Sequence, residues 1–417
     1  MSAETAGPAT ADAETFGREA LGPILAEFCQ RLWLSERFLP DAEDATLLFC
    51  ARGGLRLMRV YERFLARTGL PARIPAAPLM VSRLVAARAA LDPPGAGVLA
   101  ELGREFSGRP MAEVAAALAQ RDDLPLPAAW QDPFAAERFA TLIAADAPGA
   151  AALRAAVAEQ HARFRRHLEA CTGGRRHGLL VDTGLYGSTV RLLREGMPER
   201  RWSGLQFARS NYKRLPTPHF DCTLGLSVES DGYRAWDART AALRFWQLIE
   251  AALEPDLPSV RLFSEDGAVP RANLQVAGWE ARIGPEEPGL FSGALAHIES
   301  LGRQDVHRIP AEAARGWRVF KRAVVWPDAR MVAALELADR SRDFGRLDTV
   351  AQFAGPGGAL AQIRDSLWRE GALVRRFPRA GRAGLALIEL THAARALRRP
   401  AEALRRRLAP PALGEAQ

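Results

Sequence analysis

The chain has 417 residues, of which 48% are hydrophobic and 25% are charged. A chain of this length and composition buries a large core and divides into two or three domains, which excludes disordered and fibrous proteins. Its 56 Lys and Arg residues outnumber its 49 Asp and Glu residues, giving a formal charge of +7. Only Lys213 and Lys321 are lysines, so arginine-rich composition explains part of this bias. The remaining excess indicates anionic ligands such as phosphates, nucleic acid or a membrane surface.

The four cysteines, Cys29, Cys50, Cys171 and Cys222, are widely spaced and include no C-x-x-C pair. This pattern favours a reducing compartment and argues against structural zinc. The N-terminal segment has neither a basic nor an apolar signal region, and no apolar run reaches about 18 residues. We therefore expect a soluble cytoplasmic protein without a signal peptide or a spanning helix.

The first part of the chain predicts the start of an α/β domain. Residues 1–15 are small and polar, so we expect a disordered lead-in, followed by ordered structure over 16–84. Apolar spacing and turn residues define the elements of this part. These are a helix over 21–38, a buried strand over 46–50, a helix over 55–66 and a strand over 77–81.

The rest of the chain predicts a helical insertion and a second α/β part. Residues 85–171 are rich in alanine and other helix formers and end at a glycine pair, 173–174. The α/β pattern returns over 172–300, with strands expected over 178–181, 202–208, 222–228 and 259–263 and a helix over 190–195. Helix dominates the C-terminal region, 301–417. We predict a Rossmann-like α/β fold with a mainly parallel sheet, an α-helical insertion and an α-helical C-terminal region.

The segment 179–189, LLVDTGLYGST, is the most distinctive motif in the chain. An apolar strand ends at Asp182, and a glycine-containing, hydroxyl-rich loop then opens a helix. Such a loop suits a phosphate, because the backbone and the helix N-terminus approach the anion while Ser188 and Thr189 add hydroxyl donors. Asp182 would hold a ribose diol or a magnesium-bound water. A plain glycine turn with Ser188 or Thr189 as N-cap fits the same residues.

The turn Ala51-Arg52-Gly53-Gly54 is a second candidate for anion binding. It follows a buried strand, and the Arg52 guanidinium suits a pyrophosphate through a bidentate fork. Arg-Gly-Gly is equally compatible with a surface turn. Ligands bind where neighbouring strand ends converge, so two such turns in one sheet favour a shared site.

Together these motifs resemble the phosphoribosyltransferase fold, in which a pyrophosphate loop follows an early strand and a loop for phosphoribosyl diphosphate (PRPP) follows a later one. The chain is more similar to the phosphoribosyltransferase module of bacterial glycan phosphoribosyltransferases, which is often fused to a HAD-type phosphatase. The shared stretches are 48–62, 79–83 and 181–189, with Glu250 and 263–264 in comparable places. The resemblance covers roughly residues 20–300.

Two positions depart from these patterns. Nucleobase enzymes carry two adjacent acids in the PRPP loop, whereas Asp182 is followed here by Thr183 in a slightly shorter loop. Related glycan enzymes commonly have Asp at the position of Gly53. The first departure argues against ordinary nucleotide salvage, and the second removes an acid from the pyrophosphate loop.

The resemblance implies transfer of ribose 5-phosphate from PRPP to a sugar hydroxyl of a glycan, with inversion and loss of pyrophosphate. It implies Asp182 and Arg52 as the catalytic residues, with Asp182 on the ribose and in indirect contact with Mg²⁺, and Arg52 on the leaving pyrophosphate. The other implied PRPP-binding residues are Gly53, Gly54, Arg83, Thr183, Gly184, Tyr186, Gly187, Ser188 and Thr189. A separate HAD-type phosphatase would remove the 5-phosphate, because the chain contains no D-x-D pair for that chemistry.

A general base for the acceptor hydroxyl is less distinctive in the sequence. The candidates are Asp221, Asp237, Glu250 and His219, because a base must be an available proton acceptor near the entering hydroxyl. Each of them is also compatible with a loop charge or a helix surface group. The remaining histidines have no metal-ligand spacing.

The C-terminal arm, 373–408, is rich in arginine, with only Glu389 and Glu402 as acids and leucines interleaved. A basic amphipathic segment suits an anionic membrane surface, where a lipid-linked glycan would be the acceptor. A packed helix with a solvated arginine face explains the same pattern. No recognised motif indicates sequence-specific nucleic-acid binding.

The sequence therefore predicts a phosphoribosyltransferase-like enzyme that uses PRPP and Mg²⁺ to modify a surface polysaccharide. One alternative is a phosphoribosyltransferase acting on a nucleobase or another small acceptor. The other is a non-catalytic protein that binds PRPP or a nucleotide and regulates a partner, which the single acid of the loop and Gly53 both permit.

Overall fold

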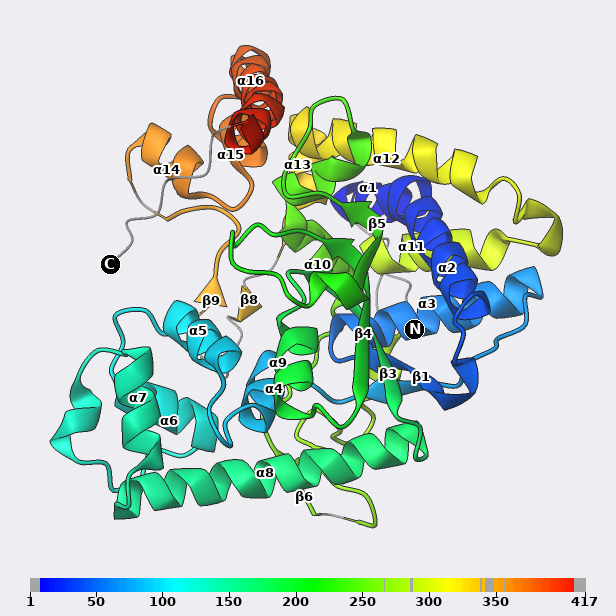
Figure 1. Cartoon of the computed structure of the whole chain (residues 1–417). Coiled ribbons are helices and arrows are strands. Elements are labelled where there is room, and N and C mark those ends of the chain that lie inside the picture. Colours follow the sequence, from blue (N-terminus) through cyan, green and yellow to red (C-terminus); the bar gives the residue numbers. More distant parts are fainter. Residues whose placement is uncertain are drawn as a thin grey trace, which may run out of the picture.

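The computed structural model describes residues 8–265, 267–285, 288–337, 340–341, 349–355 and 357–408. Side chains are described for all of these except 340–341, 349–350 and 398–408. Within this part of the chain the structure is an α/β fold whose central sheet is covered by helices on both faces (Figure 1). The predicted Rossmann-like α/β class is confirmed.

Five parallel strands form the central sheet in the order β2-β1-β3-β4-β5. The strands are β1 (Ala45–Cys50), β2 (Ala76–Leu79), β3 (His177–Leu185), β4 (Arg201–Arg209) and β5 (Thr223–Glu229). All five coincide with predicted strands to within a few residues. The strand predicted over 259–263 is only a two-residue pair here, because β6 (Phe263–Ser264) meets β7 (Arg271–Ala272) outside the main sheet.

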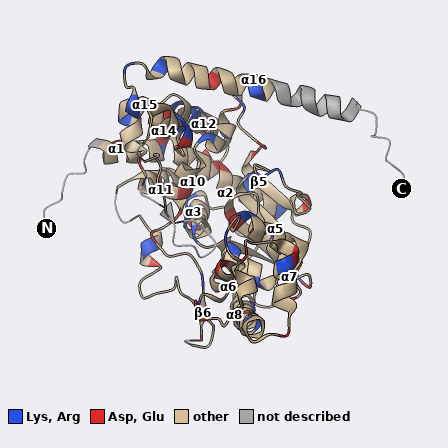
Figure 2. Cartoon of the chain, turned by 90° about the vertical axis from the view of Figure 1, so that its left-hand side faces the viewer, with Lys and Arg blue, Asp and Glu red and all other residues tan. Residues whose placement is uncertain are grey.

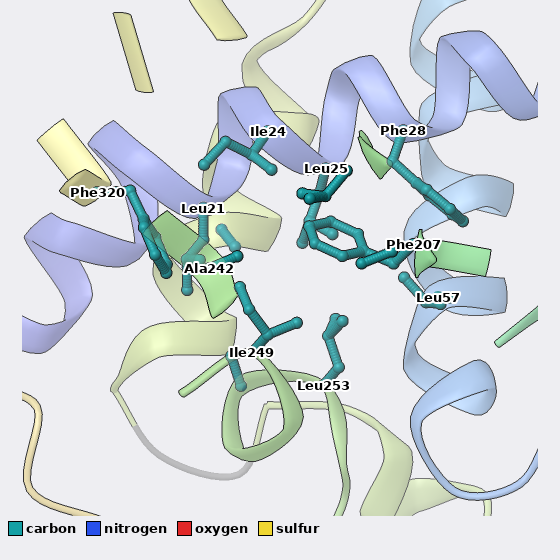
Figure 3. Packing of buried hydrophobic residues seen from close by; sticks show 14 of the residues in the cluster. Leu21, Ile24, Leu25, Phe28, Leu57, Phe207, Ala242, Ile249, Leu253 and Phe320 are labelled. Carbon is teal, nitrogen blue, oxygen red and sulfur yellow. The ribbon is translucent and has the colours of Figure 1, made fainter. Parts of the chain in front are cut away.

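Alternate side chains of β1 enter two different cores. Leu47 and Phe49 belong to the core under one helical layer, whereas Leu48 and Cys50 belong to the core on the other face. All six residues of β1 are buried, which is why this strand reads as a continuous apolar run rather than an alternating one. Figure 3 shows the first core, where Phe207 of β4 lies between side chains of several helices.

The first layer of helices packs on the core shown in Figure 3. It consists of α1 (Pro8–Phe16), α2 (Gly22–Arg37), α3 (Gly53–Thr68), α10 (Trp246–Leu253), α11 (Leu290–Ser300) and α12 (Ile309–Val325). The predicted lead-in over 1–15 is wrong from Pro8 onward, because α1 packs on α11 and on α13 (Ala329–Ala334), and its Phe16 ring lies 5.9 Å from that of Phe320. Residues 1–7 lie outside the described part.

The second layer contains the predicted helical insertion. Its helices are α4 (Arg83–Ala89), α5 (Ala96–Glu105), α6 (Met111–Ala119), α7 (Ala136–Ala144), α8 (Pro148–Thr172) and, after β3, α9 (Ser188–Gly196). The long helix α8 runs along the lower side of the molecule in Figure 1 and ends at Gly173, whose positive φ of 57° forms the helix cap. The insertion is thus a helical subassembly that shares a core with the sheet.

Helices also dominate the C-terminal region, as predicted. After α12 come α13 (Ala329–Ala334), α14 (Ala359–Asp365), α15 (Arg369–Arg376) and α16 (Gly381–Leu408), with the short pair β8 (Arg340–Ser341) and β9 (Thr349–Val350). Among the described residues no single helix is long and apolar enough to cross a membrane. The pair α7 and α8 meets that test only together, with a bend of 93° between its helices.

Candidate functional site

A cavity of about 750 Å³ lies where the segments that follow all five strands converge. The strand order reverses between β1 and β3, and in sheets of this order ligands bind outside the carboxyl ends of the strands at such a reversal. Nearly all of the predicted PRPP-binding residues line this cavity. They are Arg52, Gly53, Arg83, Asp182, Thr183, Gly184, Tyr186, Gly187, Ser188 and Thr189. The predicted loops therefore meet at one site.

The last residues of β3 and the turn into α9 contain two glycines with positive φ. Gly184 has a φ of 118°, and a Cβ there would lie 2.0 Å from the Ala208 carbonyl oxygen of β4. Gly187 has a φ of 75° and is the N-cap of α9, which no side chain caps. Ser188 is the first helical residue, so the alternative that Ser188 or Thr189 is the N-cap is wrong. The uncapped first turn of α9 borders the cavity and is suited to bind an anion.

Lys213, in the segment after β4, lies beside this helix N-terminus. Its Nζ donates to Ser188 Oγ at 2.8 Å and to Glu101 Oε1 at 2.9 Å. The ammonium also lies 4.7 Å from the centre of the Tyr186 ring. Since only 3% of the Lys213 side chain is exposed, these contacts fix the cation at the cavity wall.

Glu101 comes from helix α5 of the insertion and is the counter-charge of this cation. Its carboxylate also pairs with Arg104 at 2.5 Å and approaches Arg83 at 3.6 Å. Burial opposes its ionisation, but Lys213 and Arg104 lower the pKa of Glu101 to about 2. Burial lowers the pKa of Lys213 to about 8 although Glu101 opposes that shift. The lysine thus remains a cation at neutral pH and is the more easily neutralised partner.

The turn between β1 and α3 forms the opposite wall. Arg52 pairs with Glu254 at 2.8 Å and donates to the Leu257 carbonyl at 3.2 Å, which holds its guanidinium at the cavity. Gly53 lies under Thr183, whose Cγ2 would be 2.7 Å from a Cβ at that position. Gly54 does not line the cavity. A Cβ there would lie 2.9 Å from backbone atoms of both Phe49 and Val181, so this glycine lets α3 approach the sheet. The Ala51–Arg52 and Gly184–Leu185 peptide bonds are cis.

Asp182 lies half-buried in the second half of β3, which continues to Leu185 rather than ending at Asp182 as predicted, and it borders the cavity. Its Oδ1 accepts a hydrogen bond of 2.8 Å from the Thr183 amide, which orients the carboxylate. Among the described residues no three His, Cys, Asp or Glu side chains gather as a metal site. Mg²⁺ often uses one or two carboxylates together with substrate phosphates, so Asp182 fits a magnesium ion that arrives with a diphosphate.

Of the four predicted base candidates, Glu250 alone lines the cavity. It lies on α10 and accepts a hydrogen bond of 2.9 Å from Trp246 Nε1. Asp221 is a largely exposed ion-pair partner of Arg194, and Asp237 caps a short 3₁₀ turn. The structure places both of them away from the cavity.

His219 is also placed away from the cavity, as a packing residue. It is 1% exposed, and its Nε2 lies 2.6 Å from the Tyr186 carbonyl oxygen. Burial lowers the pKa of His219. The Tyr186 hydroxyl in turn donates to the Pro216 carbonyl at 2.6 Å and accepts from Arg191 at 3.2 Å. Tyr186 is therefore fixed in the wall, and its ring faces Lys213.

The far end of the cavity is built from segments that the sequence motifs did not indicate. Tyr233 follows β5, Arg244 precedes α10, and His392 and Arg395 come from α16. The Tyr233 hydroxyl donates to Glu389 at 2.6 Å, so α16 is anchored to the cavity rim. Among the described residues, six cationic side chains and four carboxylates line the cavity. The site therefore favours an anionic ligand.

Sequence reasoning missed Lys213, although one signal pointed to it. Only two of the 56 Lys and Arg residues are lysines, and Lys213 closely follows a predicted strand on the side where ligands bind. No signal of that kind marks Arg244 or His392, whose place depends on the packing of α16. No known protein-family model matches the sequence, and no curated protein is similar to it.

Proposed function

We propose that the protein is a PRPP-dependent phosphoribosyltransferase that moves ribose 5-phosphate onto a sugar hydroxyl of a glycan. One observation carries the proposal: the loops after β1 and β3 meet at one cavity, where Lys213 stands beside the uncapped N-terminus of α9. A phosphate at that position would be bound by backbone amides, hydroxyls and a buried cation together.

The donor would extend across the cavity between its two loops. Its 5-phosphate would occupy the N-terminus of α9, close to Ser188 and Lys213. Asp182, on the strand β3 that leads into α9, would accept hydrogen bonds from the ribose hydroxyls. The pyrophosphate would lie toward Arg52 and Arg83, whose guanidinium groups border the same cavity.

The acceptor would enter from the side of α10 and α16. Its hydroxyl oxygen forms a bond to C1 of the ribose from the face opposite the pyrophosphate, and the bond between C1 and the pyrophosphate oxygen breaks. The pyrophosphate keeps the bonding electrons, and the hydroxyl proton passes to Glu250. Arg52 stabilises the charge that develops on the leaving oxygen, while the two loops hold the ribose in place.

Mg²⁺ would bind with the donor and neutralise part of its diphosphate charge, with Asp182 as the carboxylate on the protein side. The 5-phosphate would remain on the product. The chain has no D-x-D pair, so a separate HAD-type phosphatase would act next. We expect the transfer to take place in the cytoplasm.

The test is pyrophosphate release from PRPP with Mg²⁺, with and without a synthetic or lipid-linked glycan acceptor. We expect acceptor-dependent release in the wild type and at least a hundredfold less in Asp182→Asn, because the variant keeps the shape of the site and loses the carboxylate. The control is Asp221→Asn, which changes an exposed carboxylate outside the cavity. If a nucleobase stimulates pyrophosphate release as strongly as the glycan does, the acceptor is a small molecule and the glycan assignment is wrong.

A non-catalytic PRPP sensor is a second candidate, favoured by the engagement of Arg52 with Glu254 and by Gly53, which leaves the β1–α3 turn without an acid. Calorimetric binding of PRPP without turnover on any acceptor would support it. Absence of PRPP binding would refute both candidates.

A further inference from the structure

Helix α16 has two faces of different character. Its inner face packs on the rim of the cavity: Leu385 is 2% exposed, Glu389 accepts the hydrogen bond from Tyr233, and His392 contacts Arg244. These contacts hold the first half of the helix against the body of the protein. Figure 2 shows the helix along one outer edge of the molecule, so its other face is turned outward.

The outer face is an apolar stripe. Leu387, Leu390 and Leu397 are 69%, 67% and 67% exposed, which places them among the most exposed large apolar side chains of the described residues. These leucines and two exposed alanines follow one another at alternating intervals of four and three residues. The stripe consists of Ala383, Leu387, Leu390, Ala394 and Leu397. The sequence continues the same spacing at Ala401, Leu404 and Leu408.

Arginines accompany the stripe on both sides. At about 100° per residue, Arg382 and Arg395 fall on opposite sides of the leucines, toward the inner face of the helix. Both are exposed, and Arg395 also borders the cavity. The part of the helix after Leu397 adds five arginines to the sequence, against one acid. These are Arg398, Arg399, Arg405, Arg406 and Arg407, with Glu402. An apolar stripe between guanidinium groups is complementary to a surface with an apolar interior and anionic head groups.

We propose that α16 docks the protein on an anionic lipid surface, with the leucines of the stripe at the acyl boundary and the arginines at the phosphates. A second copy of the chain fits this face less well, although the spacing of the apolar residues in the stripe also suits a coiled coil. Pairing two such helices would bring their arginine-rich segments together, and the segments contain too few acids to compensate these positive charges.

The docking surface lies directly behind one end of the cavity. His392, Arg395 and Ala396 line the cavity, while Leu390 and Leu397 of the same helix face outward. A protein bound through α16 would therefore hold its cavity within one helix diameter, about 10 Å, of the lipid surface. If the proposed function is correct, the acceptor that reaches this end is attached to a lipid. Only this last consequence depends on the proposed function.

The experiment is flotation of the purified full-length protein with phosphatidylcholine vesicles, with and without about one third phosphatidylglycerol. Three proteins are compared: wild type, the stripe variant Leu387→Gln/Leu390→Gln/Leu397→Gln, and the control Phe38→Gln/Leu224→Gln/Leu360→Gln. The control removes three exposed apolar side chains from other surfaces. Circular dichroism checks that all three fold, and the single variant Leu390→Asp repeats the test with a smaller change.

We expect the wild type and the control to float only with anionic vesicles, and the stripe variant to lose at least tenfold in the lipid partition coefficient. About 0.5 M NaCl should weaken wild-type binding several-fold, because the arginine contribution is screened. Equal flotation of wild type and stripe variant, or none at all, would overturn the proposal. A wild-type dimer in lipid-free sedimentation that the stripe variant abolishes would assign the face to a second copy. PRPP binding is measured separately on the same proteins, so failure of docking is distinguishable from failure of the proposed function.

Discussion

Substitution of Lys213 tests whether this lysine binds phosphate or serves only as the partner of Glu101 in a structural ion pair. Its Nζ lies 2.8 Å from Ser188 Oγ at the N-terminus of α9, where the donor phosphate would bind. A charge-assisted hydrogen bond contributes about 1.5–3 kcal/mol, so Lys213→Met should weaken ribose 5-phosphate binding about 10- to 150-fold. Isothermal titration calorimetry without Mg²⁺ measures this directly, because ribose 5-phosphate has no diphosphate. The control is Lys321→Met, which removes the other lysine and lies outside the cavity.

The same variant should also destabilise the protein, for a different reason. It leaves Glu101 buried without its lysine, and breaking a buried ion pair costs about 3–5 kcal/mol. We expect the lower end of that range, because Arg104 remains 2.5 Å from the carboxylate. The double variant Glu101→Gln/Lys213→Met removes both charges and should recover most of the stability in urea unfolding. It should not recover phosphate binding. Wild-type affinity in Lys213→Met would refute the assignment of Lys213 to the phosphate.

The pH dependence gives an independent check. Burial lowers the pKa of Lys213 to about 8, so the free protein loses this cation as the pH rises through that value. A bound phosphate dianion favours the protonated lysine, so binding must take up a proton above pH 8. Affinity for ribose 5-phosphate should then fall by up to tenfold per pH unit. Lys213→Met should show no such decline above pH 8, and a decline of equal size in the variant would contradict the role of this lysine.

Two further variants test the general base and the packing of α3 on the sheet. Glu250→Gln should lower kcat about a hundredfold with little change in the KM for PRPP, in steady-state assays with a glycan acceptor; an unchanged kcat would exclude Glu250 as the base. Gly54→Ala should lower the free energy of unfolding by about 1–3 kcal/mol, because its Cβ would meet backbone of both β1 and β3 at 2.9 Å. Gly69→Ala, at the end of the same helix, is a comparison without a steric clash, since no atom lies within 4 Å of its Cβ and only the cost of its positive φ, about 1 kcal/mol, applies. No loss in Gly54→Ala, measured by urea unfolding, would show that the close approach of α3 to the sheet contributes nothing, because Gly54 has no positive φ that would add a cost of its own.

The sequence predicted those parts of the structure that local patterns determine. The strand 46–50 was recognisable because a strand buried on both faces is mostly apolar, and all residues of β1 are buried, with Thr46 as the one hydroxyl. The loop 182–189 was recognisable because a strand that turns directly into a helix needs residues such as Gly184 and Gly187, which adopt positive φ. Both features depend on residues that are close together in the chain, so the local sequence is enough to predict them.

Other parts of the site depend on contacts between distant segments. Glu101 and Lys213 are 112 positions apart, and the helix that carries Glu101 was predicted only as part of an insertion. The same holds for His392, which reaches the cavity because α16 packs on Tyr233 and Arg244. No local spacing distinguishes these residues from ordinary helical charges. Helix α1 was missed for a related reason, since its small residues become ordered only by packing on α11 and α13.

The choice of lysine at position 213 is itself informative in a chain that otherwise uses arginine. A guanidinium is planar, stays charged in proteins and needs room for its fork, whereas an ammonium is compact and directs three donors tetrahedrally. At position 213 the side chain is 3% exposed, and hydroxyl, carboxylate and aromatic ring surround Nζ on different sides. The buried Glu101 favours a cation there, and the compact ammonium satisfies the hydroxyl and the carboxylate together. The same enclosure lowers the pKa of the ammonium, so the group that would hold the phosphate is also the one whose charge responds to pH near neutrality.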